Sequence, residues 1–178
     1  MVFKNPQKIV LVSGAPGAGK TTLAVPLARE LNFTLITKDD IKETLYEALD
    51  GRPDDMAFSK KVGAAAWEVL WKLASMSPEV VLEANFRPNS SIEQAHLAAL
   101  EGQIIEVRCH CPPEEAVRRY AARAAAGKRH YAHALHTLTA EQVAEFESWM
   151  GLGTLLEVDT TNPVDIPTLV QRISNTWT

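Results

Sequence analysis

A short glycine-rich segment near the start of the sequence has the residue types and spacing of a phosphate-binding loop. It matches the pattern G-x-x-x-x-G-K-[ST] in full, and its members are Gly14, Ala15, Pro16, Gly17, Ala18, Gly19, Lys20 and Thr21. Glycine lets the backbone wrap an anion with its N–H groups pointing inward. The Lys20 ammonium is then expected to reach the β and γ phosphates of a nucleotide, and the Thr21 hydroxyl to bind Mg²⁺. The alternative interpretation is a glycine-rich turn that only packs a helix on a strand.

Two adjacent carboxylates, Asp39 and Asp40, follow a short apolar segment at residues 33–37. If that segment is a strand of an open α/β sheet, its carboxyl end lies at the edge where ligands bind. There Asp39 could orient a hydroxyl group of a second substrate and accept its proton as the oxygen attacks a γ-phosphate. Alternatively, one of the two acids serves only as the N-cap of the next helix.

Another carboxylate, Glu83, ends the apolar run at residues 80–82 and is followed by Asn85 and Arg87. An acidic residue at the end of an apolar strand requires a partner. One candidate partner is Mg²⁺ with its water shell, and the other is an arginine in a buried salt bridge. Arg87 could hold the second substrate, or it could simply be solvated.

Arg119 and Arg123 lie further along the chain, four positions apart, so in a helix they share one face. Guanidinium groups suit the charge that builds up on a phosphoryl group during its transfer. We therefore expect both arginines to act in catalysis and Arg119 to bind the nucleotide as well. With the basic segment that follows, they would form a lid over about residues 118–138 that excludes water. Alternatively, Arg118 and Arg123 form surface ion pairs with a glutamate of the same helix, which would contribute little.

Three histidines, His130, His133 and His136, repeat every third residue and could form a metal site with Cys109 and Cys111. A Cys-x-Cys pair in a strand is a poor match to the usual Cys-x-x-Cys spacing, so we do not favour zinc. The two cysteines point to one face of a strand with little freedom to close a ring, and we expect reduced thiols.

Short β-branched apolar runs alternate with helical patterns along the whole chain, which is typical of a parallel sheet with helices on both faces. We expect strands at residues 8–13, 33–37, 80–84, 104–109 and 154–159. We expect helices at residues 21–31, 40–49, 56–76, 90–100, 114–125, 140–150 and 164–177. The expected fold is therefore α/β: one P-loop NTPase domain over residues 1–178, with a five-stranded parallel sheet and a helical lid.

Length and composition agree with one globular domain: the chain has 178 residues, of which 46% are hydrophobic and 22% charged. The formal net charge of −4 has the wrong sign for a protein that coats nucleic acid, although a local basic groove remains compatible with it. No apolar run is long enough to cross a membrane, and the first residues lack the pattern of a signal peptide. We expect a cytoplasmic protein with no membrane partner, and nothing in the sequence indicates an oligomeric state.

These motifs and their order resemble the AAA_33-type family of small P-loop kinases, which includes chloramphenicol phosphotransferase-like enzymes and the kinase domain of polynucleotide 5′-kinases. The segment GAPGAGKTT is similar to the family's phosphate-binding loop and adds Thr22 to the expected nucleotide site. The segment TKDDIKE resembles the one whose first aspartate is the general base in polynucleotide kinases, which corresponds to Asp39. The segment CPPEEAVRRYAARAAAGKRH resembles the lid, with Arg119 and Arg123 in the positions of its phosphate-contacting arginines.

The resemblance implies an ATP- and Mg²⁺-dependent enzyme that phosphorylates a hydroxyl group. The segment LEANFRP resembles the family's acceptor site, and Lys42 stands where polynucleotide kinases carry an arginine for the acceptor's phosphate. The expected acceptor-binding residues are Asp39, Lys42, Glu83, Asn85 and Arg87. The acidic pI of about 5.7 favours a small-molecule acceptor.

Two alternatives stay open. The acceptor could be the 5′-hydroxyl end of a polynucleotide, or the protein could be a nucleotide-binding regulatory module without transfer chemistry. GTPases of the switch type are not favoured, because their Asn-Lys-x-Asp and Asp-x-x-Gly strings are absent from the sequence.

Overall fold

The computed structural model describes residues 5–133 and 137–177, and within them the chain forms one five-stranded sheet in the order β2-β3-β1-β4-β5. All neighbouring strands are parallel. The strands are β1 (Lys8–Ser13), β2 (Thr34–Thr37), β3 (Glu79–Glu83), β4 (Gln103–His110) and β5 (Thr154–Asp159). The helices are α1 (Lys20–Leu31), α2 (Lys38–Ala48), α3 (Met56–Ala74), α4 (Ser91–Ala98), α5 (Pro113–Ala125), α6 (Ala140–Ala144) and α7 (Ile166–Thr176). The expected α/β fold with its five strands is confirmed.

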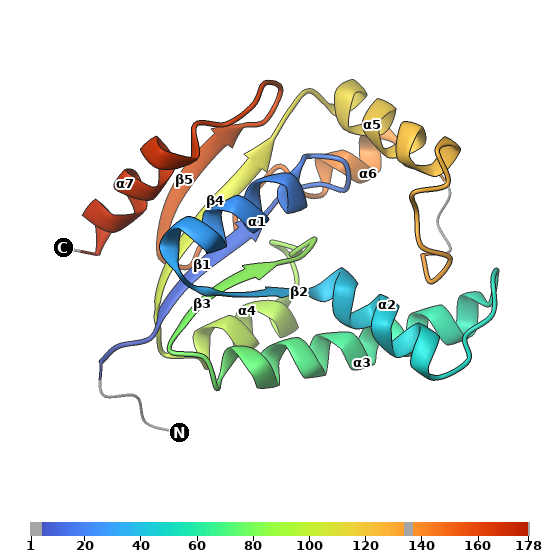
Figure 1. Cartoon of the computed structure of the whole chain (residues 1–178), viewed down its shortest axis with the longest axis horizontal. Helices are drawn as coiled ribbons and strands as arrows, with labels where there is room; N and C mark the ends of the chain where they lie inside the picture. The colour runs from blue at the N-terminus through green and yellow to red at the C-terminus, as the bar shows by residue number, and fades with distance from the viewer. Residues whose placement is uncertain (1–4, 134–136, 178) are drawn as a thin grey trace.

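Alternate residues of the strands point to opposite faces of the sheet, and each face is covered by its own helices (Figure 1). Val10 and Val12 of β1 pack in a cluster with Leu27 of α1 and Ile173 of α7. On the other face the sheet packs against α3 and α4, and the cluster there includes Leu11, Leu82, Leu70, Trp71 and Leu97. The sheet is therefore apolar on both sides, and polar side chains gather where its strands end.

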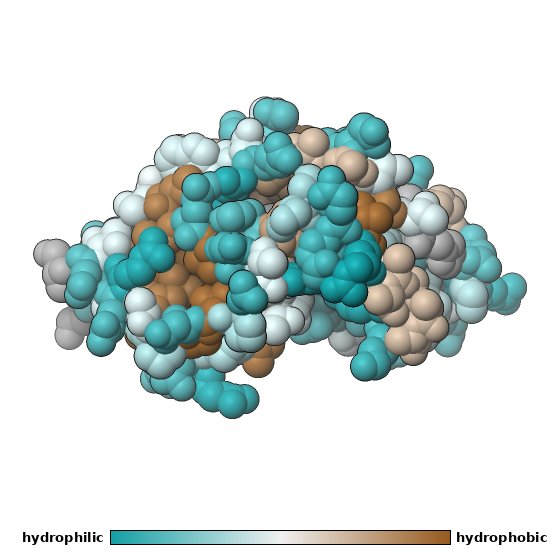
Figure 2. Space-filling model, turned by 90° about the horizontal axis from the view of Figure 1, so that it is seen from above, coloured by the Kyte–Doolittle hydropathy of each residue, from teal (hydrophilic) through white to brown (hydrophobic). Residues whose placement is uncertain are grey.

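The carboxyl ends of the strands and the two termini lie at opposite ends of the molecule (Figure 1). Seen from above, hydrophilic residues cover most of the surface, and the largest hydrophobic patch lies towards the end that carries the termini (Figure 2). Within the described residues, no helix is long and apolar enough to span a membrane.

Two local expectations are wrong. Neither Asp39 nor Asp40 caps α2: the N-cap is Thr37, the last residue of β2, whose hydroxyl accepts a hydrogen bond from the Asp40 backbone N–H at 3.2 Å. The strand runs directly into the helix, so no separate capping residue is needed.

The helix expected over residues 140–150 ends at Ala144, although Thr139 and Gln142 form the expected capping box. Further along, two backbone groups bond to side chains of β4 where a continuing helix would have bonded them internally. The Met150 N–H donates to Glu106, and the Glu147 carbonyl accepts from Arg108.

Glu106 is the most deeply buried acidic residue of the described chain, with no exposed surface. One carboxylate oxygen accepts a hydrogen bond from Ser13 Oγ at 2.6 Å, and the other accepts from the Met150 N–H at 2.8 Å. Burial raises the pKa of Glu106 above its ordinary value of 4.5, and these two hydrogen bonds oppose that effect. The carboxylate ties the end of β1, which leads into the phosphate-binding loop, to the chain that precedes β5.

We expect Glu106→Ala to lower the free energy of unfolding by about 3 kcal/mol, because the substitution opens a cavity and leaves the Met150 N–H without an acceptor. Glu106→Gln keeps an acceptor for that N–H and is expected to stay within about 1 kcal/mol of the parent protein. The folded protein holds a proton on Glu106 at pH values where the unfolded chain has released it. The free energy of unfolding of the parent protein therefore falls as the pH rises from 4.5 through the raised pKa. The Gln variant has no titrating group at this position, so it should not show this fall. Urea unfolding across that window measures both effects, and an Ala variant as stable as the Gln variant would contradict this account.

Candidate active site

The phosphate-binding loop joins β1 to α1 and packs tightly against two other elements. Gly14 has φ +130°, and a Cβ atom there would lie 2.3 Å from the Cys109 carbonyl oxygen of β4. Gly17 has φ +85°, and its Cβ atom would lie 2.2 Å from the Ala116 carbonyl oxygen of α5. Both conformation and space therefore require glycine at these two positions. The loop ends at Gly19, the N-cap of α1, so the positive helix end faces the place where an anion would bind.

Lys20 is buried at the first position of α1, and its Nζ donates a hydrogen bond to the Ala15 carbonyl at 2.8 Å. The side chain thus spans the phosphate-binding loop. Burial lowers the pKa of Lys20, and the nearby Glu83 carboxylate opposes this shift by favouring the charged ammonium.

Thr21 and Glu83 bring two oxygen ligands together beside the loop. Thr21 Oγ1 donates a hydrogen bond to Glu83 Oε2 at 3.1 Å, and both residues line the cleft described below. Burial raises the pKa of Glu83, whereas Lys20 lowers it. No ion pair between Glu83 and an arginine occurs among residues 5–133 and 137–177; the carboxylate accepts from the Thr21 hydroxyl and lies near the Lys20 ammonium. A hydroxyl and a carboxylate are oxygen donors of the kind that Mg²⁺ prefers, and the pair therefore fits the predicted metal role.

Asp39 lies in the first turn of α2, at the carboxyl end of β2, and its side chain is 48% exposed. Burial by itself would raise the pKa of Asp39, but the neighbouring basic side chains outweigh it and hold the pKa below the usual 3.8. His133 is the strongest of these, followed by Lys38, whose Nζ lies 3.6 Å from Asp39 Oδ1, and then by Lys20. Asp39 is therefore an ionised carboxylate at neutral pH.

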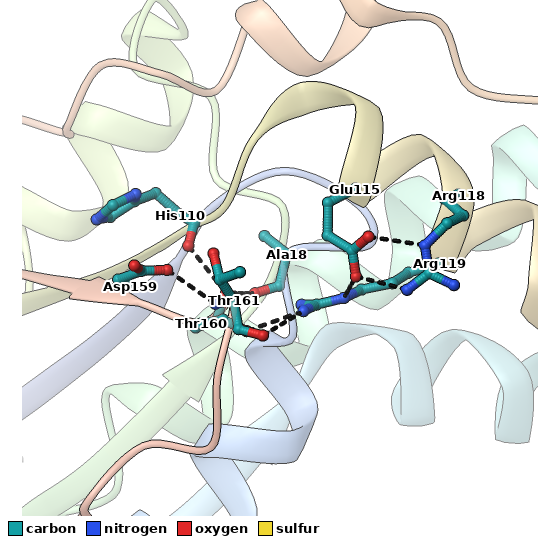
Figure 3. Close-up of polar contacts among 8 residues, drawn as sticks. All are labelled: Ala18, His110, Glu115, Arg118, Arg119, Asp159, Thr160 and Thr161. Carbon is teal, nitrogen blue, oxygen red and sulfur yellow. Dashed lines mark hydrogen bonds and ion pairs between the residues drawn. The ribbon is translucent and has the colours of Figure 1, made fainter.

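The Arg119 side chain is held by hydrogen bonds to two different elements, α5 and the loop after β5 (Figure 3). Its Nε donates to Glu115 Oε1 at 2.6 Å, and its Nη2 donates to the carbonyls of Thr160 at 3.0 Å and Thr161 at 3.2 Å. Its Nη1 lies beside Gly19, 3.8 Å from the place where a Cβ atom would be. The guanidinium is thus held against the phosphate-binding loop.

The ion pair expected for Arg118 as an alternative does form, with Glu115 at 2.7 Å, but Glu115 binds Arg119 as well. Arg118 is 69% exposed and Arg119 only 26%, so the two neighbours differ in environment. Arg123 is exposed in the last turn of α5, on the wall of the cleft.

The loop after β5 connects α5, β4 and the phosphate-binding loop. Thr160 Oγ1 is within hydrogen-bond distance of two carbonyls, those of Ala18 at 2.7 Å and His110 at 2.9 Å (Figure 3). Thr160 was not singled out as a site residue from the sequence, because nothing in the segment DTTN distinguishes a structural threonine from a surface one.

The chain that follows α5 descends towards α2 and α3 (Figure 1). His130 Nε2 lies 3.1 Å from Glu47 Oε1, and His133 Nε2 lies 2.8 Å from Glu43 Oε1. Both glutamates belong to α2, so two histidines hold this segment to that helix. No group of three or more potential metal ligands occurs in the described parts of the chain. His136, the third histidine of the predicted cluster, lies outside them, as do the other residues at 134–136 of the predicted lid.

A cleft of about 870 Å³ lies between these elements. Among the residues that line it, the sequence had indicated Pro16, Gly17, Gly19, Lys20, Thr21, Thr22, Asp39, Glu83, Asn85, Arg119 and Arg123. The backbone of Gly14, Ala15 and Ala18 belongs to the phosphate-binding loop, but these three residues are not part of the lining. The cleft is also lined by residues to which the sequence analysis gave no site role, including Lys38, Glu43, Arg118, Tyr120, Arg129 and Thr160.

Two residues expected in the acceptor site do not reach the cleft. Lys42 is buried and its Nζ donates to Ser59 Oγ of α3 at 2.9 Å. Arg87 is exposed after β3, and its backbone N–H donates to Glu93 Oε2 at 2.8 Å. Neither residue lines the cleft, and their direct contact with an acceptor stays a prediction.

The parallel sheet and the loop between β1 and α1 define this chain as a P-loop protein of the α/β class. The AAA_33 family model, described as an AAA domain, matches residues 9–149. The chain belongs to this family, as its motifs predicted.

Several solved structures with the same fold are kinases. A protein from Chloroflexus aurantiacus, described provisionally as a kinase, is 28% identical with a TM-score of 0.83, and the match covers 97% of this chain and 99% of that one. Shikimate kinase from Acinetobacter baumannii is 19% identical with a TM-score of 0.61, over 98% and 94% of the two chains. The Mycobacterium tuberculosis APS kinase, solved with AMPPNP and APS, is 18% identical with a TM-score of 0.57, over 97% and 98%. No protein in a set of curated sequences matches the chain.

Proposed function

We propose that the protein is a kinase that transfers the γ-phosphate of ATP to a hydroxyl group of a small molecule, with Mg²⁺ as the metal. The observation that carries this proposal is that Asp39 and Lys20 line the same cleft, close enough for the ammonium to lower the pKa of the carboxyl. A carboxylate beside the phosphate-binding lysine is where an acceptor hydroxyl must be held for attack on a γ-phosphate. The family membership and the kinase fold of the similar structures support it.

In the proposed reaction, the acceptor oxygen forms a bond to the γ-phosphorus while the bond from that phosphorus to the β,γ-bridging oxygen breaks. ADP leaves, and the hydroxyl proton moves to the Asp39 carboxylate. Because the pKa of Asp39 is low, the carboxylate acts mainly by orienting the hydroxyl and takes the proton late.

The phosphates are held by the amides of the loop and by Lys20, which exchanges the Ala15 carbonyl for a phosphate oxygen. Arg119 reaches the developing charge without reorganising, since Glu115 and the Thr160 carbonyl fix it in advance. Arg123 would reach the same phosphoryl group from the next turn of α5.

Thr21 and Glu83 would hold Mg²⁺, directly or through its water shell, and when bound the ion would neutralise phosphate charge. We expect Glu83→Gln to raise the Mg²⁺ concentration for half-maximal activity by about 10-fold, since one formal charge at the site is lost. Glu79→Gln, at the exposed start of the same strand, is the matched control and should leave the requirement unchanged. Titration of Mg²⁺ at saturating ATP measures the shift, and identical requirements in the two variants would remove Glu83 from the metal site.

The proposed function is tested by transfer of labelled γ-phosphate from ATP to a pooled panel of nucleosides, antibiotics, sugars and 5′-hydroxyl oligonucleotides. A labelled small molecule establishes the kinase and its acceptor class. A labelled oligonucleotide, with acceptor binding that weakens steeply as salt increases, would instead indicate a polynucleotide kinase. Tight binding of ATP without any labelled product would favour the regulatory module.

A further inference from the structure

Arg129 has a buried donor that no described residue satisfies. Its guanidinium carbon lies 4.3 Å from the centre of the Tyr120 ring, and Arg129 lines the cleft. Its Nη1 is buried without a hydrogen-bond partner among residues 5–133 and 137–177. Burying a charged donor without an acceptor costs free energy. A ligand bound in the cleft would supply the missing acceptor.

The contacts of the neighbouring residues place Arg129 over α2 and α3, at the acceptor end of the cleft. His130 is held to Glu47 of α2. Two residues further on, the Ala132 carbonyl accepts a hydrogen bond from Ser59 Oγ of α3 at 2.6 Å, and Ser59 Oγ in turn accepts from Lys42 Nζ. Ala132 is completely buried. These contacts fix the segment that carries Arg129, so the guanidinium is positioned before any ligand binds.

Basic side chains gather at this end of the cleft, namely Lys38, Lys42 and Arg129. The pKa of Lys42 is lowered to about 8, mainly by burial and also by the charges of Lys38 and Arg129, while the carboxylates of Asp39 and Glu43 oppose the shift. Lys38 pairs with Asp39 at 3.6 Å. The glutamates of α2 contact histidines of the segment after α5: Glu43 lies 2.8 Å from His133, and Glu47 lies 3.1 Å from His130. Arg129 forms no ion pair with a carboxylate among residues 5–133 and 137–177, and its hydrogen bond to the neutral Tyr120 hydroxyl does not balance its charge, so the charge is left for a ligand.

We propose that the acceptor is an anionic alcohol, with a carboxylate or phosphate group that Arg129 binds while its hydroxyl group meets Asp39. This inference rests on the proposed kinase function. A guanidinium forms two parallel hydrogen bonds to either anion, so the two groups share one recognition chemistry. Lys38 and Lys42 add to the positive electrostatic potential around the bound anion, and Lys42 does so without contacting it.

The test is a transfer assay with matched acceptors: a neutral polyol, the corresponding hydroxy acid, the methyl ester of that acid, and the phosphorylated polyol. We expect transfer to the hydroxy acid and to the phosphorylated polyol, and little transfer to the neutral polyol or the ester. The ratio of kcat/KM for the acid to that for the phosphorylated polyol shows which of the two anions the site prefers. Arg129→Gln should lower kcat/KM for the charged acceptors by about 10- to 100-fold and leave KM for ATP within about twofold. Arg129→Lys should restore part of the loss. Arg172→Gln, a change at an exposed arginine of α7 that does not line the cleft, is the matched control.

The outcomes separate this inference from the kinase function on which it rests. Transfer to the neutral members with an unaffected Arg129→Gln variant would keep the kinase and overturn the anionic acceptor. A change only in KM for ATP would assign Arg129 to the nucleotide and also overturn it. If no acceptor is labelled, inorganic phosphate is titrated into protein already saturated with AMPPNP and Mg²⁺. Binding that is lost in Arg129→Gln supports the anion site without the kinase, and equal binding in both proteins, or none in either, overturns the site.

Discussion

The Asp39→Asn variant is expected to lose phosphate transfer by a factor of about 10² to 10⁴ while its affinity for ATP stays nearly unchanged. An amide cannot accept the acceptor's proton, and it holds the hydroxyl less firmly than a carboxylate does. Asp39 is half-exposed at the start of α2, and Thr37 caps that helix, so the substitution removes no structural contact of the cap. Steady-state transfer together with equilibrium binding of ATP measures the two quantities separately.

Asp40→Asn is the matched control, because Asp40 lies in the same turn, carries the same charge and is exposed. It should transfer phosphate at close to the parent rate. The low pKa of Asp39 adds a second signature: the carboxylate is ionised throughout the neutral range, so its own titration should reduce activity only as the pH falls towards 3.8 and below. Equal rates in Asp39→Asn and the parent protein would remove Asp39 from the transfer step.

The part of the site built from one continuous segment could be predicted because its chemistry is local. The phosphate-binding loop needs glycine where φ is positive and where the Cys109 and Ala116 carbonyls come close, and these requirements fix a readable pattern. The parallel sheet could be predicted for a similar reason, since strands buried on both faces consist of unbroken apolar runs such as residues 9–12.

What could not be predicted depends on contacts between distant segments. Glu43 and Glu47 are one helical turn apart and meet His133 and His130, but 90 and 83 residues separate the partners, and no local pattern connects them. The buried position of Lys42 follows from Ser59 on another helix. Glu106 is the single acid in the apolar run of β4, but nothing in the sequence identifies Ser13 and the Met150 N–H as its partners.

Arg119→Ala is expected to reduce the rate of transfer by about 10³-fold or more, the effect of removing an arginine that stabilises a transferring phosphoryl group. Two of its three nitrogens are used to hold the side chain, by Glu115 and by the carbonyls after β5, which leaves Nη1 at the phosphate-binding loop. Because different nitrogens anchor the side chain and face the loop, we expect Arg119→Lys to reduce the rate of transfer almost as much as Arg119→Ala. A single ammonium group cannot be anchored at both places and still reach the phosphates. Single-turnover transfer with saturating ATP isolates this step.

Arg118→Ala separates the catalytic contribution from the structural one. Arg118 shares Glu115 with Arg119, but it is largely exposed, and a surface ion pair contributes little to stability. We therefore expect its variant to transfer phosphate at nearly the parent rate. Arg119 also links α5 to the loop after β5, so its removal lowers stability as well, and thermal unfolding of the Ala and Lys variants accounts for that part. If both Arg119 variants remain folded at the assay temperature and keep the parent rate, the guanidinium serves only to join α5 to that loop.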